Sequence, residues 1–177
     1  TLIDAWVRRN YTNLSYDEDA KIARSGQVHE GLLKDLLASP FFTESFPKST
    51  GPEYFNLDMV DRLVPKELSP ADVIATLARF TAESIALAIQ GYTGLTHGNV
   101  YASGGGARNP LLMEYLRELL PGFSIADSQE LGIESAAKEA VLFALLANET
   151  LMDPNPSKER RLGDSPWVTM GKISFSC

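Results

Sequence analysis

Residues 100–112 read VYASGGGARNPLL, and this order indicates a β-strand, a tight turn and an α-helix in direct succession. The apolar run 100–102 predicts the strand. The glycines at 104–106 predict the turn, because glycine adopts backbone conformations that other residues disfavour. Asn109 is expected to be the N-cap of the helix and Pro110 its first residue. The segment therefore predicts a strand that enters a helix through a turn of bare backbone.

Such a turn suits an anionic ligand, above all a nucleotide. Glycine has no Cβ, so a ligand can approach the main chain, and the start of a helix offers N–H groups without an internal partner. The run is neither the dinucleotide fingerprint nor a Walker A loop. On local grounds, a close strand-to-helix turn that holds no ligand fits these residues equally well.

Outward from this turn, the second half of the chain predicts a βαβα order. Residues 123–126 predict a second strand, and residues 134–151 predict a last long helix. Strand, helix, strand, helix is typical of a parallel sheet. Two strands, even with a third at 173–176, are few for a stable open sheet. Either residues upstream complete the sheet or a strand escapes the pattern.

The first half of the chain predicts helices. Apolar spacing favours short helices at 2–10, 17–27, 30–38 and 56–64. The clearest helix is 69–90, with Ser69 as N-cap, Pro70 at its first position and Gly91 as its stop. Its broad apolar face suits packing across a sheet. Residues 41–53, FFTESFPKSTGPE, predict an ordered loop. We expect one α/β lobe, helical over about 1–92 and βαβα over about 98–177.

Charge and hydropathy exclude several partners. The net charge of −7 is spread along the 177 residues, which disfavours nucleic acid and anionic membranes. No apolar run approaches membrane-spanning length, and the start TLIDAW lacks the basic region of a signal peptide. Because that start also lacks an initiator Met, we expect the chain to be cut from something longer.

Cysteine and histidine are scarce. The one cysteine is Cys177, which excludes an internal disulfide and a Cys-based zinc site and fits a reducing compartment such as the cytoplasm. His29 and His97 are too few and too far apart in sequence to indicate a metal site. No metal site built from the side chains of the chain is expected.

Two further places carry side chains suited to chemistry. Glu139 has small or apolar neighbours at helical spacing, and a carboxylate on a buried stripe usually has a partner. It could position a water or a substrate hydroxyl, or it could be a structural Glu bonded to a helix start or a lysine. Lys48, Ser49 and Thr50 precede Gly51 and could offer a cation and hydroxyls to a sugar or phosphate. A plain surface turn fits these three equally well.

Six segments, taken in order, resemble one family, the 1,6-anhydro-N-acetylmuramic acid kinases of the sugar kinase, Hsc70 and actin superfamily. They run nearly from end to end of the chain, and the PKSTG and GGGARNP elements are the most specific. The segments are LIDAW (2–6), YDEDAKIARSG (16–26), PKSTGPEYF (47–55), SGGGARNPLLMEYL (103–116), LGIESAAKEAVLFALLA (131–147) and VTMGKIS (168–174).

The resemblance implies a two-lobed enzyme with ribonuclease-H-like sheets that uses ATP and Mg²⁺ and binds its ligands between the lobes. Members of the family open the anhydro bridge with water and phosphorylate the 6-oxygen, in cytoplasmic recycling of cell-wall amino sugars. The chain would be the helix-rich C-terminal lobe with a truncated sheet. Its partners would be ATP, the sugar and the N-terminal lobe of the same protein, and a homodimer is left open.

The resemblance also implies roles for single residues. The turn corresponds to the adenosine motif, which assigns cofactor binding to Gly104, Gly105, Gly106, Ala107, Arg108 and Asn109. Glu139 falls in a Lys-Glu-Ala segment and is the candidate second carboxylate. It would assist a catalytic aspartate expected just before LIDAW, so the fragment alone is expected to be inactive. Asp4 and the group Lys48, Ser49 and Thr50 are the candidates on the sugar side.

The chain departs from the family pattern at two positions. Family members usually carry Arg where this chain has Pro52, and Gly where it has Ala20. The lost guanidinium removes a charge partner, which leaves the substrate open. The competing hypotheses are a non-catalytic nucleotide-binding or regulatory module that keeps the fold, and a related kinase for another anhydro sugar or for acetate.

Overall fold

A computed structural model describes residues 1–132, 134 and 137–152 of the chain. It forms two compact units, the first spanning Thr1–Asp127 and the second beginning at Ser128. The strand expected at 173–176 lies outside the described residues. The first unit contains the glycine turn, and the second contains Glu139.

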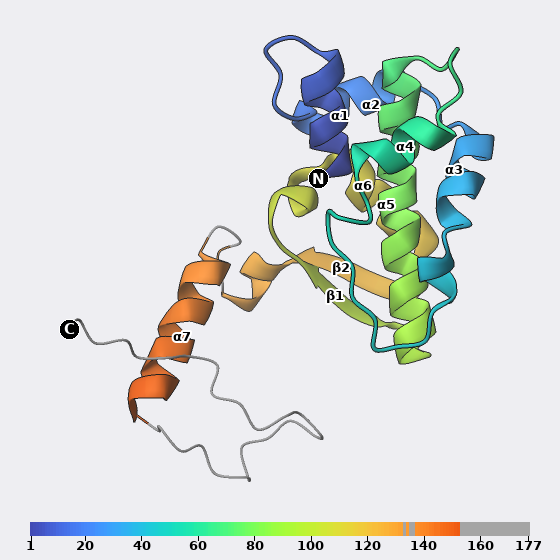
Figure 1. The fold of residues 1–177 in the computed structure, drawn as a ribbon. Coiled ribbons are helices and arrows are strands. Elements are labelled where there is room, and N and C mark those ends of the chain that lie inside the picture. Colours follow the sequence, from blue (N-terminus) through green and yellow to red (C-terminus); the bar gives the residue numbers. More distant parts are fainter. Residues whose placement is uncertain (133, 135–136, 153–177) are drawn as a thin grey trace. The chain divides into compact units, whose positions relative to one another are not determined.

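The longest helix, α5 (Pro70–Thr93), runs through the whole first unit (Figure 1). Its N-terminal half buries Val73, Ile74 and Leu77 completely. Four helices gather around this half and supply most other members of the same apolar cluster, to which Ala20 and Leu111 also belong. The four helices are α1 (Leu2–Asn10), α2 (Lys21–Ser25), α3 (Glu30–Leu37) and α4 (Leu57–Leu63). The expected helical first half of the chain is thus observed.

The C-terminal half of α5 covers a small sheet. Ala82 and Ala86 are buried there and allow close approach of α6 (Pro110–Leu119), whose Leu112 and Leu116 belong to the same cluster. Half-buried side chains of the strands, among them Ile125, pack against that cluster. The expectation that α5 lies across a sheet is confirmed for this half.

Strands β1 (Gly98–Ala102) and β2 (Phe123–Asp127) are parallel and joined by α6, as the sequence predicts. Gly98 pairs with Phe123 and Ala102 with Asp127, so both strands end at the same edge. The architecture is therefore a helix-rich α/β fold whose described part holds a two-stranded parallel sheet.

Two helix boundaries differ from expectation. α5 continues through Gly91 and ends at Gly94, where φ is +63°. The end of the helix needs a left-handed residue, and Gly94 adopts that conformation. The helix expected at 17–27 is instead a 3₁₀ turn (Glu18–Ala20) followed by α2, because Ala20 has a φ of +57° and breaks the helical path.

The expected ordered loop at 41–53 is observed, and it begins with a 3₁₀ turn at Pro40–Thr43. Its aromatic rings order it, because Phe42 packs edge-on against Phe80 at 5.8 Å between ring centres and lies tilted against Phe55 at 6.0 Å. Phe80 belongs to α5 and is buried, so the loop is held against the core.

The second unit contains a 3₁₀ turn at Ser128–Leu131 and helix α7 (Lys138–Met152). α7 begins later than the expected residue 134. Several of its apolar side chains are exposed, Phe143 by 68% and Leu145 by 58%. Among the described residues, none of the helices has the length and apolarity needed to cross a membrane.

Candidate functional site

The glycine turn is open to solvent. Gly104, Gly105 and Gly106 are exposed, and Gly104 has a φ of +87°, which a residue with a Cβ rarely adopts. A Cβ built on Gly104 or Gly105 would have no atom within 4 Å. The main chain of the turn is therefore accessible to a ligand, as the sequence predicts.

Local hydrogen bonds fix the path from the turn into α6. Residues Gly105–Arg108 form a 3₁₀ turn in which the Ala107 N–H donates to the Gly104 carbonyl over 3.2 Å. Asn109 Oδ1 then accepts a hydrogen bond of 3.0 Å from the Leu112 N–H, which confirms Asn109 as the N-cap. The side chain of Arg108 is exposed beside this cap.

The turn lies just beyond the carboxyl end of β1. Ligands of parallel α/β sheets bind outside the carboxyl ends of the strands. Asp127 is the last residue of β2 and pairs with Ala102, the last residue of β1. Asp127 is half-buried and lies at the same carboxyl edge of the sheet as the glycine turn. Sequence reasoning did not select Asp127, although the parallel register of the two strands would have indicated it. A cavity of about 340 Å³ lined by Thr96, Pro121 and Phe123 lies at the opposite edge.

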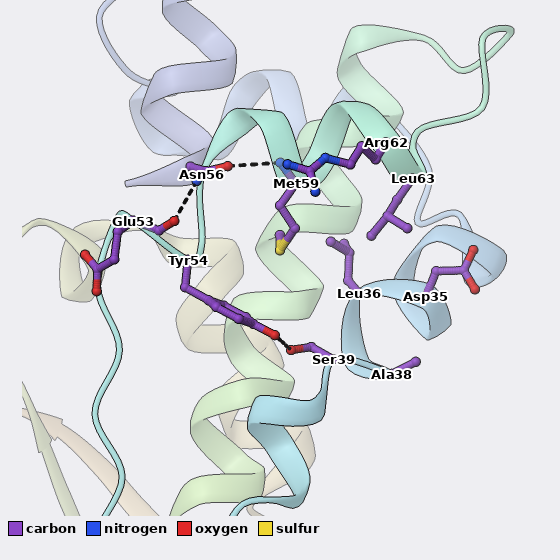
Figure 2. Close-up of a pocket in the computed structure, with 10 residues that line it drawn as sticks. All are labelled: Asp35, Leu36, Ala38, Ser39, Glu53, Tyr54, Asn56, Met59, Arg62 and Leu63. Carbon is purple, nitrogen blue, oxygen red and sulfur yellow. Dashed lines mark hydrogen bonds between the residues drawn. The ribbon is translucent and has the colours of Figure 1, made fainter.

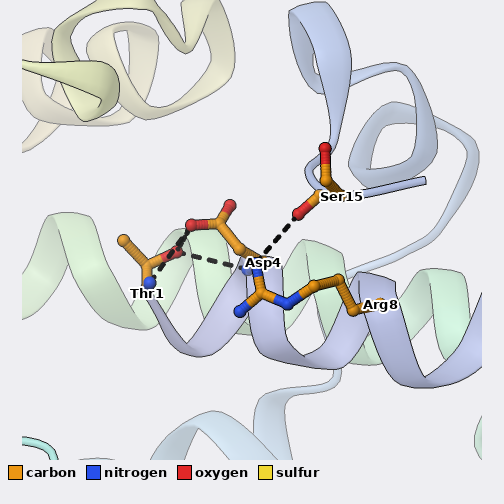
Figure 3. Close-up of polar contacts among 4 residues, drawn as sticks. All are labelled: Thr1, Asp4, Arg8 and Ser15. Carbon is orange, nitrogen blue, oxygen red and sulfur yellow. Dashed lines mark hydrogen bonds and ion pairs between the residues drawn. The ribbon is translucent and has the colours of Figure 1, made fainter.

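The start of α1 lies beside the turn, as both Figure 1 and Figure 3 show. Leu111, the second residue of α6, is buried in the same cluster as Ile3 and Val7 of α1. The sequence-predicted residue Asp4 therefore belongs to the same region of the first unit as the glycine turn.

Asp4 takes part in the N-terminal cap of α1, whose N-cap residue is Thr1. Its carboxylate accepts hydrogen bonds from the Thr1 hydroxyl at 2.7 Å and the Thr1 amino group at 3.1 Å (Figure 3). The Asp4 N–H in turn donates to the Thr1 hydroxyl over 3.2 Å, which completes a capping box. Further along α1, Arg8 donates to the carbonyl oxygen of Ser15.

Lys48 is engaged within its own loop. Its ammonium donates to the carbonyl oxygens of Phe41 and Phe42 at 2.7 and 3.2 Å. It also lies 4.7 and 4.9 Å from the ring centres of Phe41 and Phe46. The neighbouring Ser49 and Thr50 are exposed.

Glu139 lies in the first turn of α7, in the second unit. The expectation that it sits on a buried stripe is not met, because its side chain is exposed and Leu142 and Phe143 are exposed as well. Over the described residues, no group of three or more His, Cys, Asp or Glu side chains is arranged to hold a metal ion.

Two carboxylates that link helices, those of Asp61 and Asp72, have lowered pKa values. Two hydrogen bonds of 2.7 Å from the Arg9 guanidinium to the Asp61 carboxylate lower the pKa of Asp61. Hydrogen bonds from the Ser69 hydroxyl and from the Gln27 N–H lower the pKa of Asp72. These carboxylates tie α1 to α4 and residue 27 to α5, so their shifts reflect structure.

The comparison with known proteins decides the family. A model of the family described as anhydro-N-acetylmuramic acid kinase matches residues 1–175. The chain belongs to this family. Membership implies an actin-like fold, which agrees with the helix-rich α/β architecture, and it confirms the resemblance seen in the sequence segments.

Individual relatives are similar over nearly the whole chain. The anhydro-N-acetylmuramic acid kinase of Pseudoalteromonas atlantica is 48% identical over 99% of this chain, and that of Pseudoalteromonas translucida is 43% identical over 99%. The Coxiella burnetii (strain RSA 493) protein of the same name is 39% identical over 98%. The chain spans about 45% of the length of each of these relatives.

Proposed function

We propose that this chain is the C-terminal, nucleotide- and sugar-binding lobe of a cytoplasmic, ATP-dependent kinase. The kinase opens 1,6-anhydro-N-acetylmuramic acid with water and phosphorylates its 6-oxygen in cell-wall amino-sugar recycling. The observation that carries the proposal is the open glycine turn at the carboxyl end of β1. The family membership of the chain and the names of its relatives support the choice of reaction.

The turn suits a nucleotide in three respects. The empty space over Gly104 and Gly105 leaves room for a ligand against the backbone. The exposed guanidinium of Arg108 is suited to pair with a phosphate, and the start of α6 favours negative charge. Phosphoryl transfer depends on positioning and charge neutralisation, which Mg²⁺ bound with the nucleotide supplies. Such an ion needs only one or two protein carboxylates besides the phosphates.

The sugar side of the proposal rests on fewer contacts. Asp4 lies at the start of α1 beside the turn, and we assign it to the sugar. Ser49 and Thr50 are exposed and supply hydroxyls, whereas Lys48 orders their loop through Phe41 and Phe42. Glu139 is the assisting carboxylate, and the principal base is an aspartate upstream of Thr1.

Nucleotide binding by the 177-residue chain is the direct test. Calorimetric titration with ATP and Mg²⁺ should show saturable binding. Gly105→Ala should weaken it at least tenfold, because the new methyl group would occupy space that is open in the protein. The control is Gly91→Ala, whose methyl group would lie 3.8 Å from Phe46, far from the turn in sequence, and should leave binding unchanged. Absence of binding, or equal loss in both variants, would contradict the proposal.

A second candidate function has one observation in its favour. Pro52, which replaces an arginine usual in the family, lies in an exposed turn of the loop that carries Ser49 and Thr50. It favours a kinase for another anhydro sugar, or a non-catalytic nucleotide-binding module. Turnover by the chain joined to its upstream sequence decides among the three. Phosphate transfer to 1,6-anhydro-N-acetylmuramic acid supports the first, transfer only to another anhydro sugar supports the second, and ATP binding without transfer supports the third.

A further inference from the structure

A cavity of about 390 Å³ lies in the first unit between the end of α3, helix α4 and the loop that joins them (Figure 2). This volume falls in the range of roughly 300–1,000 Å³ found for small-molecule sites. Leu36, Met59 and Leu63 form its apolar part. None of the residues selected from the sequence lines it.

Tyr54 closes one side of the cavity. Its side chain reaches from the loop to the end of α3, where its hydroxyl shares a hydrogen bond of 2.9 Å with Ser39 Oγ (Figure 2). The Tyr54 side chain is 44% exposed, although its ring also packs against Phe55 at 5.0 Å between ring centres. The cavity thus offers an aromatic ring fixed at both ends and two hydroxyls that keep acceptor capacity.

The charged residues that line the cavity are two acids, Asp35 and Glu53, and one base, Arg62. Asp35 and Arg62 are exposed, and within the described part of the chain their side chains make no hydrogen bond or ion pair. Asn56 is partly used, because its Nδ2 donates to the Glu53 carbonyl and its Oδ1 accepts from the Met59 N–H. The Glu53 carboxylate folds back against Gly51. The lining of the cavity therefore carries two carboxylates and one guanidinium.

This chemistry selects a class of ligand. A phosphate or a carboxylic acid would be repelled by Asp35 and Glu53 more than it is attracted by Arg62. A neutral polyhydroxyl ring can instead place its C–H face on the Tyr54 ring and share its hydroxyls with Asp35, Arg62 and the pair formed by Tyr54 and Ser39. We propose that this cavity is a binding site for a neutral pyranose sugar. The site is separate in its residues from the glycine turn and does not depend on nucleotide binding.

Backbone NMR of the ¹⁵N-labelled 177-residue chain tests the proposal with four probes. N-acetylglucosamine and glucose are the neutral pyranoses, inorganic phosphate is the anion, and glycine is the zwitterion. The pyranoses should produce saturable shifts in the amides of residues 35–39 and 53–63. Phosphate and glycine should produce none there. Shifts confined to residues near Asp4 would mean that the sugar binds at the start of α1, and this result would overturn the proposal.

Matched variants separate the contribution of the Tyr54 ring to sugar binding from that of its hydroxyl group. Tyr54→Phe keeps the ring and should weaken pyranose binding at least threefold, and Tyr54→Leu should weaken it at least tenfold. The control Tyr16→Phe alters a tyrosine that is 55% exposed outside the cavity and should change nothing. Asp35→Asn and Arg62→Gln change exposed side chains that the fold does not need, and each should weaken binding at least threefold. No saturable shift with either sugar, or unchanged affinity in the Asp35 and Arg62 variants, would overturn the proposal.

Discussion

Lys48 donates a hydrogen bond of 2.7 Å from Nζ to the carbonyl oxygen of Phe41 and lies 4.7 Å from the centre of the same residue's ring. One ammonium thus satisfies the backbone of the 3₁₀ turn at Pro40–Thr43 and packs on its aromatic side chain. The lysine, chosen from the sequence as a sugar ligand, thus links the loop that carries Ser49 and Thr50 to the 3₁₀ turn at Pro40–Thr43.

Lys48→Met should destabilise the chain by about 1.5–3 kcal/mol, because a hydrogen bond to a charged group contributes about that much. The methionine keeps most of the aliphatic stem, so the loss reports the ammonium. Urea denaturation followed by circular dichroism measures it. Lys66→Met is the control, since Lys66 is exposed and makes no contact of this kind within the described residues. Equal stability of the two variants would contradict the conclusion that Lys48 stabilises this loop.

Ala20 and Ala23 form a matched pair for backbone strain. Both are buried, at 0% and 2% exposure, but Ala20 has a φ of +57° and Ala23 is helical. Glycine costs about 0.5–1 kcal/mol in a helix, whereas it relieves a left-handed alanine of about 1–2 kcal/mol. Ala20→Gly should therefore be less destabilising than Ala23→Gly by at least about 1 kcal/mol in urea denaturation. The reverse order would show that the left-handed conformation is not strained.

Gly26 is required because the chain crosses α5 closely. A Cβ at this position would lie within van der Waals overlap of the main-chain carbonyl of Ala71. Gly26→Ala should cost more than about 2 kcal/mol, since backbone atoms cannot move aside as a flexible side chain does. Gly91→Ala, which meets only the Phe46 ring at 3.8 Å inside a helix, should be neutral or stabilising by up to about 1 kcal/mol. Thermal unfolding measures the stability of the two variants. If Gly91→Ala were the less stable of the two, the requirement for glycine at position 26 would be refuted.

The ion pair of Arg9 and Asp61 makes stability depend on pH. The hydrogen bonds from Arg9 lower the pKa of Asp61 below the ordinary 3.8, so the folded chain binds this proton more weakly than the unfolded chain. The contribution is complete above the ordinary pKa and is lost as the pH falls through the lowered folded pKa. It should be below about 1 kcal/mol, because the Asp61 side chain is 45% exposed and screened by solvent.

Asp61→Asn should therefore flatten the acid limb of the curve of unfolding free energy against pH. Urea denaturation between about pH 6 and pH 3 brackets the ordinary carboxyl range. Glu67→Gln alters an exposed acid that has no ion pair among the described residues, and it should keep the limb of the original chain. An acid limb that is as steep in Asp61→Asn as in the original chain would contradict the assignment.

Much of the fold could be predicted because it depends on local signals. The caps Asn56, Ser69 and Asn109 each bond a backbone N–H three residues further along, so a short window of sequence contains the whole interaction. The parallel pairing of the strands follows from the βαβ order. The end of α5 was predicted wrongly at Gly91 instead of Gly94, because both glycines permit a left-handed φ and a short window of sequence does not distinguish them.

The candidate site was predicted only where its residues are contiguous. The exposed turn at Gly104 and Gly105 is one short segment, and its openness was expected. The engagement of Lys48 by Phe41 and the cavity beside Tyr54 depend on the folding of a loop and two helices around it. For Glu139, helical periodicity predicted a buried stripe, and its side chain is exposed within the described residues of the second unit; its catalytic role stays a prediction.

The length of α5 has a consequence for how the first unit melts. Ile74 and Leu77 belong to one buried cluster and Ala82 and Ala86 to the other, yet all four lie on one continuous helix. The helical cluster and the cluster beside the sheet are therefore expected to unfold together within Thr1–Asp127, because one helix belongs to both. Amide hydrogens in both halves of this helix, apart from its first and last turns, should report the same free energy of opening, that of the whole unit.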